Sequence, residues 1–464
     1  MEMNWRAISS WSYRTFGLAR WLHRGRVVAY LRILFVACSL MLGLSGYNFY
    51  NSSLVSKANT QTLYSDFLSF YTAGTMASAG QSVEIYLPKT HYETEKRITG
   101  EPKVPQTGFF YPPVFVLLCL PFSHLPYAAA AVLWLVLGIA AYLASVARIV
   151  DSRLALLVGV AAPAAFLNAL YGQNAFFSTA LMSASLVLID RRPLTAGLLL
   201  GCLCYKPHFG LVLPLALLAG RRWSVIAGAT ISVVTLVTLS GAVFGLETWH
   251  NFFTVMGFAR KEFQAGAVDF KQFATVYASL RLLGVSIPLA YAVEIVVAIF
   301  ALVSVVWIWA RAEMPWTRNA ALVTATMLVA PVFLEYDLLL AVIPVLWLIR
   351  AGTAAQSPVV PSPAANISIA GAAGSSQGQA ILGRANSMDR SKPLGFLPWE
   401  RISLAAVYLI PFVSSKLVKH TDLLLPPWLL VVLMILIVRR AVYEKRQADA
   451  CMESASAPSM KVAA

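Results

Sequence analysis

Asp66 is the residue whose surroundings most favour chemistry. It is the only charged residue of the stretch 58–83, and the aromatic residues Tyr64 and Phe67 flank it. Partial removal from water raises the basicity of a carboxylate, so Asp66 fits a general base that takes the proton of a weakly acidic hydroxyl. The alternative is a helix N-cap, because Asp66 precedes an apolar run.

Lys206 is the second candidate because it stands where two apolar segments meet, directly before Pro207. A lysine in that position is costly unless it reaches the membrane surface or has a partner. It could neutralise a phosphate leaving group as a point charge, or it could simply be solvated by lipid headgroups. His208 is a weaker candidate for the same phosphate contact.

Amide and carboxylate side chains mark two further turns between apolar segments. Gln173 and Asn174 offer paired donors and acceptors for sugar hydroxyls, although such residues also cap turns. Glu335 and Asp337 flank Tyr336, where they could bind an acceptor hydroxyl or form an ion pair with the candidate lysine. Both turns therefore extend the candidate site.

A third group of candidates lies in the segment 245–287. Phe270, Phe273 and Tyr277 belong to a series of apolar residues at spacings of three and four, which predicts an amphipathic helix in the membrane interface. Arg281 lies on the same segment and could contact a lipid phosphate, although anchoring to headgroups is the more common role.

The composition indicates that these residues lie among membrane-spanning helices. Of 464 residues, 58% are hydrophobic and 12% are charged, against about 25% charged in an ordinary soluble domain. A soluble enzyme and a disordered chain are both excluded. The cysteines and histidines form no cluster with the spacing of metal ligands, so we expect no disulfide framework, no metal site and no cofactor.

The length rule predicts an all-α polytopic protein with about twelve transmembrane helices. The candidate spans lie near 30–47, 127–147, 154–170, 175–189, 194–205, 209–219, 225–244, 288–309, 320–333, 338–349, 402–415 and 425–438. This topology places the arginine-bearing joints and both termini on the cytoplasmic side. The proline-containing run 111–125 must then be re-entrant or interfacial, not a full crossing.

The same topology divides the chain into five parts. They are a basic cytoplasmic N-terminus (1–27), a transmembrane module (28–350) with large outer loops at about 48–111 and 245–287, a disordered cytoplasmic linker (351–400), two C-terminal transmembrane helices (401–440) and a disordered cytoplasmic tail (441–464). The net charge of +15 falls almost wholly in the cytoplasmic parts, so it indicates orientation and not nucleic-acid binding.

Several short motifs together resemble glycosyltransferase family 87. They are Asp66 with the following Phe-x-x-Phe-Tyr-x-Ala-Gly, Phe110-Tyr111-Pro112-Pro113-Val114, Gly172-Gln173-Asn174, Lys206-Pro207, the stretch 268–284 and Tyr336-Asp337-Leu338. The resemblance covers about residues 28–350. It implies a GT-C fold, a bundle of transmembrane helices whose first outer loop carries the catalytic base, here Asp66. The chain departs from the family in having Leu334 and Glu335, and no histidine, beside Tyr336.

The resemblance further implies an inverting transfer of mannose or another sugar from a polyprenyl-phosphate donor to an envelope lipid or glycan acceptor. The expected sugar and phosphate contacts are Lys206, His208, Gln173, Asn174, Tyr111, Tyr336, Asp337 and Arg281. The enzyme would lie among the lipids of a bacterial plasma membrane with its site at the outer face. Such a reaction needs one base and phosphate stabilisation, and it need not use a metal.

The main alternative is a secondary transporter or a lipid flippase. Such proteins tend to show internal repeats and polar sites at mid-membrane depth. Here the sequence shows no obvious repeat, and Glu294 is the only acidic residue expected well inside a span. A non-catalytic envelope scaffold would have no need of Asp66. Glycosyl transfer is therefore favoured.

Overall fold

A computed structural model describes residues 12–55, 65–101, 104, 108–311, 315–353 and 395–456. Within these ranges the fold is helical, and the short 3₁₀ and π turns are labelled η. The elements are η1 (Tyr13–Gly17), α2 (Arg24–Val55), α3 (Ser65–Ser78), η2 (Glu84–Tyr86), α4 (Pro88–Thr99), α5 (Pro113–Cys119), η3 (Leu120–His124), α6 (Tyr127–Val146), α7 (Ser152–Val160), α8 (Pro163–Tyr171), α9 (Ala175–Leu188), α10 (Pro193–Gly201), η4 (Cys202–Tyr205), η5 (Pro207–Leu211), α11 (Leu213–Ala219), α12 (Trp223–Phe244), α13 (Leu246–Ala265), η6 (Phe270–Gln272), α14 (Val276–Leu282), α15 (Ile287–Arg311), α16 (Pro315–Val329), η7 (Glu335–Ala341), α17 (Val342–Thr353), α20 (Glu400–Thr421) and α21 (Pro426–Ser456).

Six helical segments of the described residues are long and apolar enough to cross a membrane. They are Arg24–Ser45, Tyr127–Val146, Trp223–Phe244, Ile287–Arg311, Glu335–Thr353 and Pro426–Ala450. A seventh is added if α7 and α8, which meet at an angle of 53°, count as one broken span. The chain is therefore a multi-pass membrane protein, but the predicted number of about twelve crossings is not confirmed.

Short helices account for part of the difference between the predicted and the observed number of spans. Four apolar helical segments are too short to pass the length criterion, namely Pro113–His124, Ala175–Leu188, Pro193–Tyr205 and Pro207–Ala219. Three of them begin at a proline in the first helical turn. A helix rises about 1.5 Å per residue, so segments of this length fall short of a hydrocarbon core of about 30 Å. Pro113–His124, for which a re-entrant or interfacial course is predicted, is one of these short segments.

The short helices pack closely within the bundle because small residues line their contacts. At the crossing of α10 and α12, a Cβ on Gly197 would lie 2.1 Å from the Val225 carbonyl oxygen. A Cβ on Gly228 would lie 2.3 Å from the carbonyl oxygen of Leu194. Glycines at such crossings allow two backbones to approach each other, which is how helices associate where lipid removes the hydrophobic driving force.

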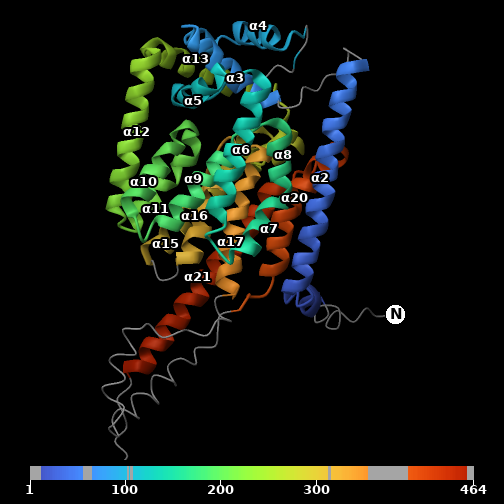
Figure 1. The fold of residues 1–464 in the computed structure, drawn as a ribbon. Coiled ribbons are helices and arrows are strands. Elements are labelled where there is room, and N and C mark those ends of the chain that lie inside the picture. The colour runs from blue at the N-terminus through green and yellow to red at the C-terminus, as the bar shows by residue number, and fades with distance from the viewer. Residues whose placement is uncertain are drawn as a thin grey trace, which may run out of the picture.

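Basic joints between helices meet at one end of the bundle. Asp190, after α9, forms ion pairs of 2.7 Å with Arg222 and 2.8 Å with Arg318. Three of the arginine-bearing joints therefore lie together, as the topology predicts for a common side. Figure 1 shows α3, α4, α5 and α13 gathered at the opposite end of the bundle.

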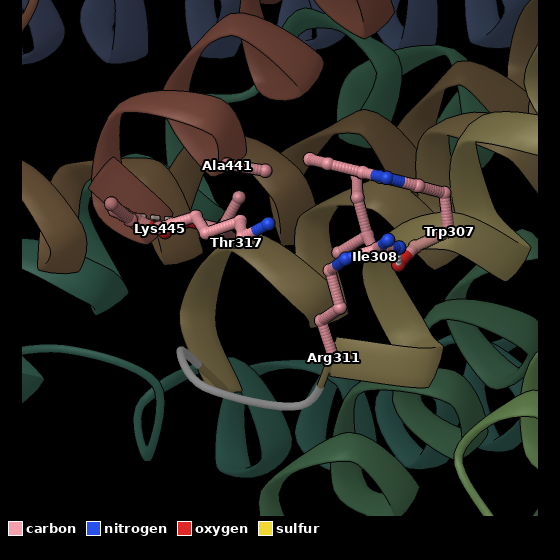
Figure 2. Close-up of a pocket in the computed structure, with 7 residues that line it drawn as sticks. Trp307, Ile308, Arg311, Thr317, Ala441 and Lys445 are labelled. Carbon is pink, nitrogen blue, oxygen red and sulfur yellow. Dashed lines mark hydrogen bonds between the residues drawn. The ribbon is translucent and has the colours of Figure 1, made fainter. Parts of the chain in front are cut away.

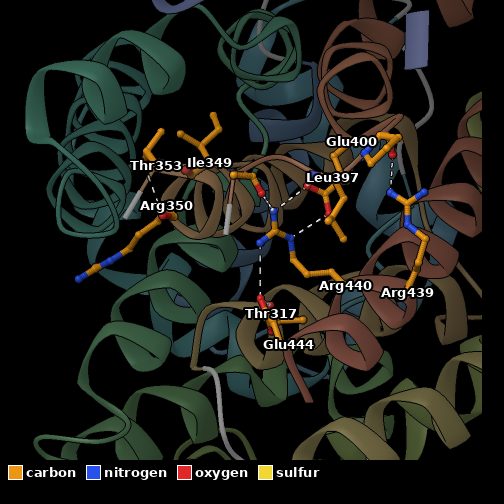
Figure 3. Close-up of polar contacts among 11 residues, drawn as sticks. Thr317, Ile349, Arg350, Thr353, Leu397, Glu400, Arg439, Arg440 and Glu444 are labelled. Atoms are coloured by element: carbon orange, nitrogen blue, oxygen red, sulfur yellow. Dashed lines mark hydrogen bonds and ion pairs between the residues drawn. The ribbon is translucent and has the colours of Figure 1, made fainter. Parts of the chain in front are cut away.

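The C-terminal helices are anchored by a buried arginine, Arg440 of α21. Its guanidinium makes two hydrogen bonds to Glu400 of α20, of 2.8 and 2.7 Å, and approaches Glu444 at 3.5 Å (Figure 3). Glu444 in turn accepts a hydrogen bond of 2.8 Å from Thr317 of α16. The paired guanidinium geometry and the full set of partners allow these charges to be buried.

This network corrects one expectation for the C-terminal part. The tail from residue 441 onward was expected to be disordered, but α21 continues as a helix to Ser456, and its buried Glu444 packs against α16. Of the predicted linker 351–400, the first three residues end α17, and residues 354–394 lie outside the described part of the chain.

The segment around Phe270 does not form the single amphipathic helix that the sequence predicts. The chain forms the short turn η6, runs extended through Phe273, and only then begins α14 at Val276. Phe273 makes an antiparallel bridge to Leu334, and the Ala274 amide donates to the Phe333 carbonyl oxygen at 2.7 Å. This segment therefore pairs with the chain that leads into η7, because its backbone groups find partners there.

Candidate active site

Asp66 lies in the first turn of α3 and is half-buried. The side-chain amide of Gln173 donates to its Oδ2 atom at 2.5 Å. A carboxylate in the first turn of a helix is also stabilised by the helix dipole. Asp66 is thus held in a defined orientation by a residue from a distant part of the chain.

The end of α8 sets the position of Gln173. The helix ends at Gly172, which has φ 69° and ψ 33°, a left-handed conformation that glycine adopts without strain. The indole of Trp134 donates to the Gly172 carbonyl oxygen at 3.1 Å and fixes this turn from the side. The turn then directs the buried Gln173 toward α3.

Tyr111 joins this group from the segment that precedes α5. Burial raises the pKa of the Tyr111 phenol, and the negative charges of Asp337 and Asp66 add to the effect. Its hydroxyl lies close to Tyr336 and to the buried Asn174, the residue that precedes α9. The phenol therefore stays protonated at physiological pH and can donate a hydrogen bond.

The backbone at Tyr111 is held in place by a second tyrosine. The hydroxyl of Tyr86 in η2 donates to the Tyr111 carbonyl oxygen at 2.8 Å. The Tyr111 ring also packs 4.5 Å from that of Phe115, between centroids. The segment from α3 to η2 therefore positions two of the polar residues, Asp66 directly and Tyr111 through Tyr86.

Lys206 and Asp337 form an ion pair in the interior of the site. Lys206 Nζ lies 2.6 Å from Asp337 Oδ1, and each side chain is only 2% exposed. The Nζ atom also lies 5.3 Å from the ring centroids of Phe209 and Tyr336. Of the two sequence-based alternatives for Asp337, the ion pair is the one observed. Phosphate binding by Lys206 stays a prediction. If Lys206 binds a phosphate, it does so while it is paired with Asp337.

Breaks in regular helix bring these two residues together. At Lys206, between η4 and η5, the backbone leaves the helical region with φ −120° and ψ 75°. Pro207 disfavours a helical conformation at the residue before it, which explains the break. Asp337 lies in the 3₁₀ segment η7, after the extended Leu334. Both side chains are thus presented from helix ends.

His208 and Arg281 relate differently to this cluster. The His208 ring packs against that of Phe209, with centroids 4.6 Å apart, and it lies within electrostatic reach of Lys206. Arg281 of α14 donates to the Val285 carbonyl oxygen at 2.8 Å and neighbours Tyr277. His208 is therefore part of the candidate site, whereas Arg281 binds a different set of residues.

Glu294, which would be a proton-coupling carboxylate in a transporter, has a structural partner. It lies within α15, and its Oε2 atom accepts a hydrogen bond of 2.7 Å from the backbone amide of Tyr277 in α14. A carboxylate that satisfies the first amides of a helix acts as a cap. The observed contact therefore gives Glu294 a role in joining α14 to α15.

Three polar contacts near the site are not predicted by the sequence motifs. Asn168 in α8 donates to the Tyr336 carbonyl oxygen at 2.8 Å, and the hydroxyls of Ser178 and Tyr205 lie 2.7 Å apart. His91 of α4 lies 3.0 Å from the Ser69 hydroxyl of α3. Asn168 was detectable as the only amide of its apolar run. The other contacts join residues whose types carry no signal by themselves.

A small cavity lies at the end of α15 (Figure 2). Its volume is about 30 Å³, which is room for about one water molecule. Its walls are Trp307, Ile308, Arg311, Thr317, Ala441, Glu444 and Lys445. None of the predicted site residues lines it. Within the described ranges, no group of three histidine, cysteine or acidic residues is placed to hold a metal ion.

The candidate site is therefore a cluster of buried donors around two carboxylates, built from the ends of short helices. Such a cluster can deprotonate a hydroxyl at Asp66 and stabilise negative charge with Tyr111, Tyr336, Asn174 and Lys206.

Comparison with known proteins identifies one family. No curated protein and no solved structure gives a significant match to the chain. The family model of glycosyltransferase family 87 matches residues 109–331, a segment that contains Tyr111, Gln173, Asn174, Lys206 and His208. Asp66 precedes the matched segment, and Tyr336 and Asp337 follow it. The resemblance predicted from the sequence motifs is thus confirmed: residues 109–331 of this membrane protein match the model of glycosyltransferase family 87.

Proposed function

We propose that the chain is a membrane glycosyltransferase that moves a sugar, mannose or another hexose or pentose, from a polyprenyl-phosphate donor to a hydroxyl of an envelope lipid or glycan. The observation that carries the proposal is the position of Asp66, which accepts a hydrogen bond from Gln173 and lies within electrostatic reach of Tyr111 and Tyr336. The family match supports glycosyl transfer as the reaction class.

In the proposed reaction, Asp66 acts as the general base. The acceptor hydroxyl gives its proton to the Asp66 carboxylate while its oxygen forms a bond to the anomeric carbon of the donor sugar. The bond between that carbon and the phosphate oxygen breaks on the opposite side, and the polyprenyl phosphate leaves with the electron pair. Attack opposite the leaving group inverts the anomeric configuration. The hydrogen bond from Gln173 keeps the Asp66 carboxylate aligned for this step.

Stabilisation of the leaving phosphate is the second requirement. We assign it to the protonated Tyr111 phenol, the neighbouring Tyr336 phenol and the Asn174 amide, which are buried or half-buried donors. Preorganised donors in a water-poor site stabilise developing charge more than water does. Lys206, held by Asp337, adds positive potential without having to move.

The location of the cluster suits a lipid-linked substrate. A polyprenyl chain stays in the bilayer because each buried CH₂ group contributes about 0.8 kcal/mol. Its phosphate therefore lies at headgroup depth, where helix ends such as those of α8 and η4 are expected. We place this end of the bundle at the outer face and both termini in the cytoplasm of a bacterial cell, in accord with the common location of the basic joints.

Reconstituted protein in nanodiscs, offered a panel of labelled polyprenyl-phosphate sugars, tests the proposal. Wild-type protein should transfer one of them, and Asp66→Asn should lower kcat by at least about a hundredfold because the base is lost. Asp422→Asn is the matched control, since Asp422 is 56% exposed and pairs with Lys271 at 2.8 Å. Wild-type rates for Asp66→Asn would refute the assignment. Movement of the lipid without sugar transfer would instead favour a flippase.

A further inference from the structure

We propose that Asn168 is the positioning residue that sets the distance between the two halves of the site. The inference rests on the proposed function, because it concerns the same reaction. One half consists of Asp66 with Gln173, and the other of Tyr336 with the Lys206–Asp337 pair. These halves come from distant parts of the chain, so a contact between them is needed to fix their relative position.

The contacts of Asn168 reach both halves. Its side-chain amide donates to the Tyr336 carbonyl oxygen at 2.8 Å. Its own carbonyl oxygen accepts the backbone amide of Gln173 at 3.0 Å, within the turn that ends α8. One residue is therefore hydrogen-bonded to the residue that aligns the base and to the residue next to Asp337.

The two hydrogen bonds of its NH₂ group set the orientation of the Asn168 amide. The side chain is 0% exposed, and its Nδ2 group donates to two carbonyl oxygens, those of Tyr336 and of Ala164, each at 2.8 Å. Only the NH₂ group can satisfy two acceptors, so the amide cannot be turned around without loss. A buried amide is costly unless it is bonded, and here its bonds join α8 to η7.

The position of Asn168 in α8 explains why its contact with Tyr336 can set the distance between the two halves of the site. Helix α8 has nine residues and is capped by Gly172, so Asn168 lies about one turn from Gln173 on a short element. A shift of η7 relative to α8 would change the distance from Asp66 to Tyr336 and to the ion pair. Misplacement by about 1 Å can cost a reaction about a hundredfold in rate. Asn168 does not need to touch substrate to have this effect.

The Asn168→Leu variant tests the inference, since leucine keeps the volume and the backbone bond but removes the side-chain donor. We expect kcat to fall by about 10- to 100-fold while KM for the donor changes less than about threefold. Hydrogen exchange should increase in residues 334–341, because their anchor to α8 is lost. Asn168→Ser gives a second test if the leucine variant folds poorly, since serine can still bond its own helix but cannot reach Tyr336.

The matched control is Asn319→Leu. Asn319 in α16 is equally buried and donates to the Leu186 carbonyl oxygen at 3.4 Å, but it belongs to the basic end of the bundle. Unchanged kcat in the Asn168 variants, an equal fall in the control, or unchanged exchange in residues 334–341 would each overturn the inference. If wild-type protein transfers no sugar at all, the proposed function fails, and the exchange data alone decide whether Asn168 anchors η7.

Discussion

Lys206 and Asp337, which are 131 positions apart in the sequence, form an ion pair with 2.6 Å between Nζ and Oδ1. The pair lies within the candidate site, where its two charges are almost completely removed from water. Each charge compensates the desolvation of the other, so neither residue can be changed alone without consequence. Single and double substitutions of the pair are therefore expected to have different effects on stability.

Single and double substitutions of this pair should differ sharply. Lys206→Met leaves a buried carboxylate without a partner and should lower the free energy of unfolding by about 3–5 kcal/mol. The double variant Lys206→Met with Asp337→Leu should recover most of this loss but not sugar transfer, because the positive potential at the site is gone. Thermal unfolding in detergent and transfer assays measure the two effects.

The exposed pair Lys96–Glu93 serves as the control for this experiment, with 2.7 Å between its charged atoms. Glu93→Gln should change the free energy of unfolding by less than about 1 kcal/mol. Equal destabilisation by Glu93→Gln and Lys206→Met would contradict the view that burial makes the inner pair critical. Full transfer activity in the double variant would show that Lys206 has no part in the reaction.

Replacement of Gln173 should move the pH dependence of transfer. Gln173→Leu removes the hydrogen bond of 2.5 Å that favours the charged form of Asp66, so the pKa of Asp66 rises. Gln173→Glu raises it further, because a second carboxylate lies beside the first. A general base works when deprotonated, so the acidic limb of the profile should shift to higher pH, more for Glu than for Leu. Profiles of kcat/KM against pH measure the shift; identical profiles would count against Asp66 as the base.

The orientation of the bundle can be tested with single cysteines in a chain whose five native cysteines are replaced. Tyr171 at the end of α8 is 42% exposed, so Tyr171→Cys should react with an impermeant maleimide on intact cells. Arg192, exposed before α10, should be labelled as Arg192→Cys only after permeabilisation. The reverse pattern would place the site in the cytoplasm.

Much of the class and of the site could be predicted from residue types and order. The apolar composition predicts a multi-pass membrane protein, and the motifs around Tyr111, Gln173 and Lys206 predict the family. The number of spans could not be predicted in the same way, because an apolar run shows burial or lipid contact but not whether a helix is long enough to cross. Prolines such as Pro193 and Pro207 shorten several of these runs.

The sequence by itself determined the chemistry available to this protein: a carboxylate among aromatic residues at Asp66, a lysine at a helix break, and amides at a turn. Only the tertiary structure decided which of these side chains meet. Asp66 lies 107 positions from Gln173, and Lys206 is bound by Asp337 instead of standing as an unpaired cation. Local sequence carries no record of such partners, because they are selected by the packing of short helices and by the cost of burying an unpaired polar group.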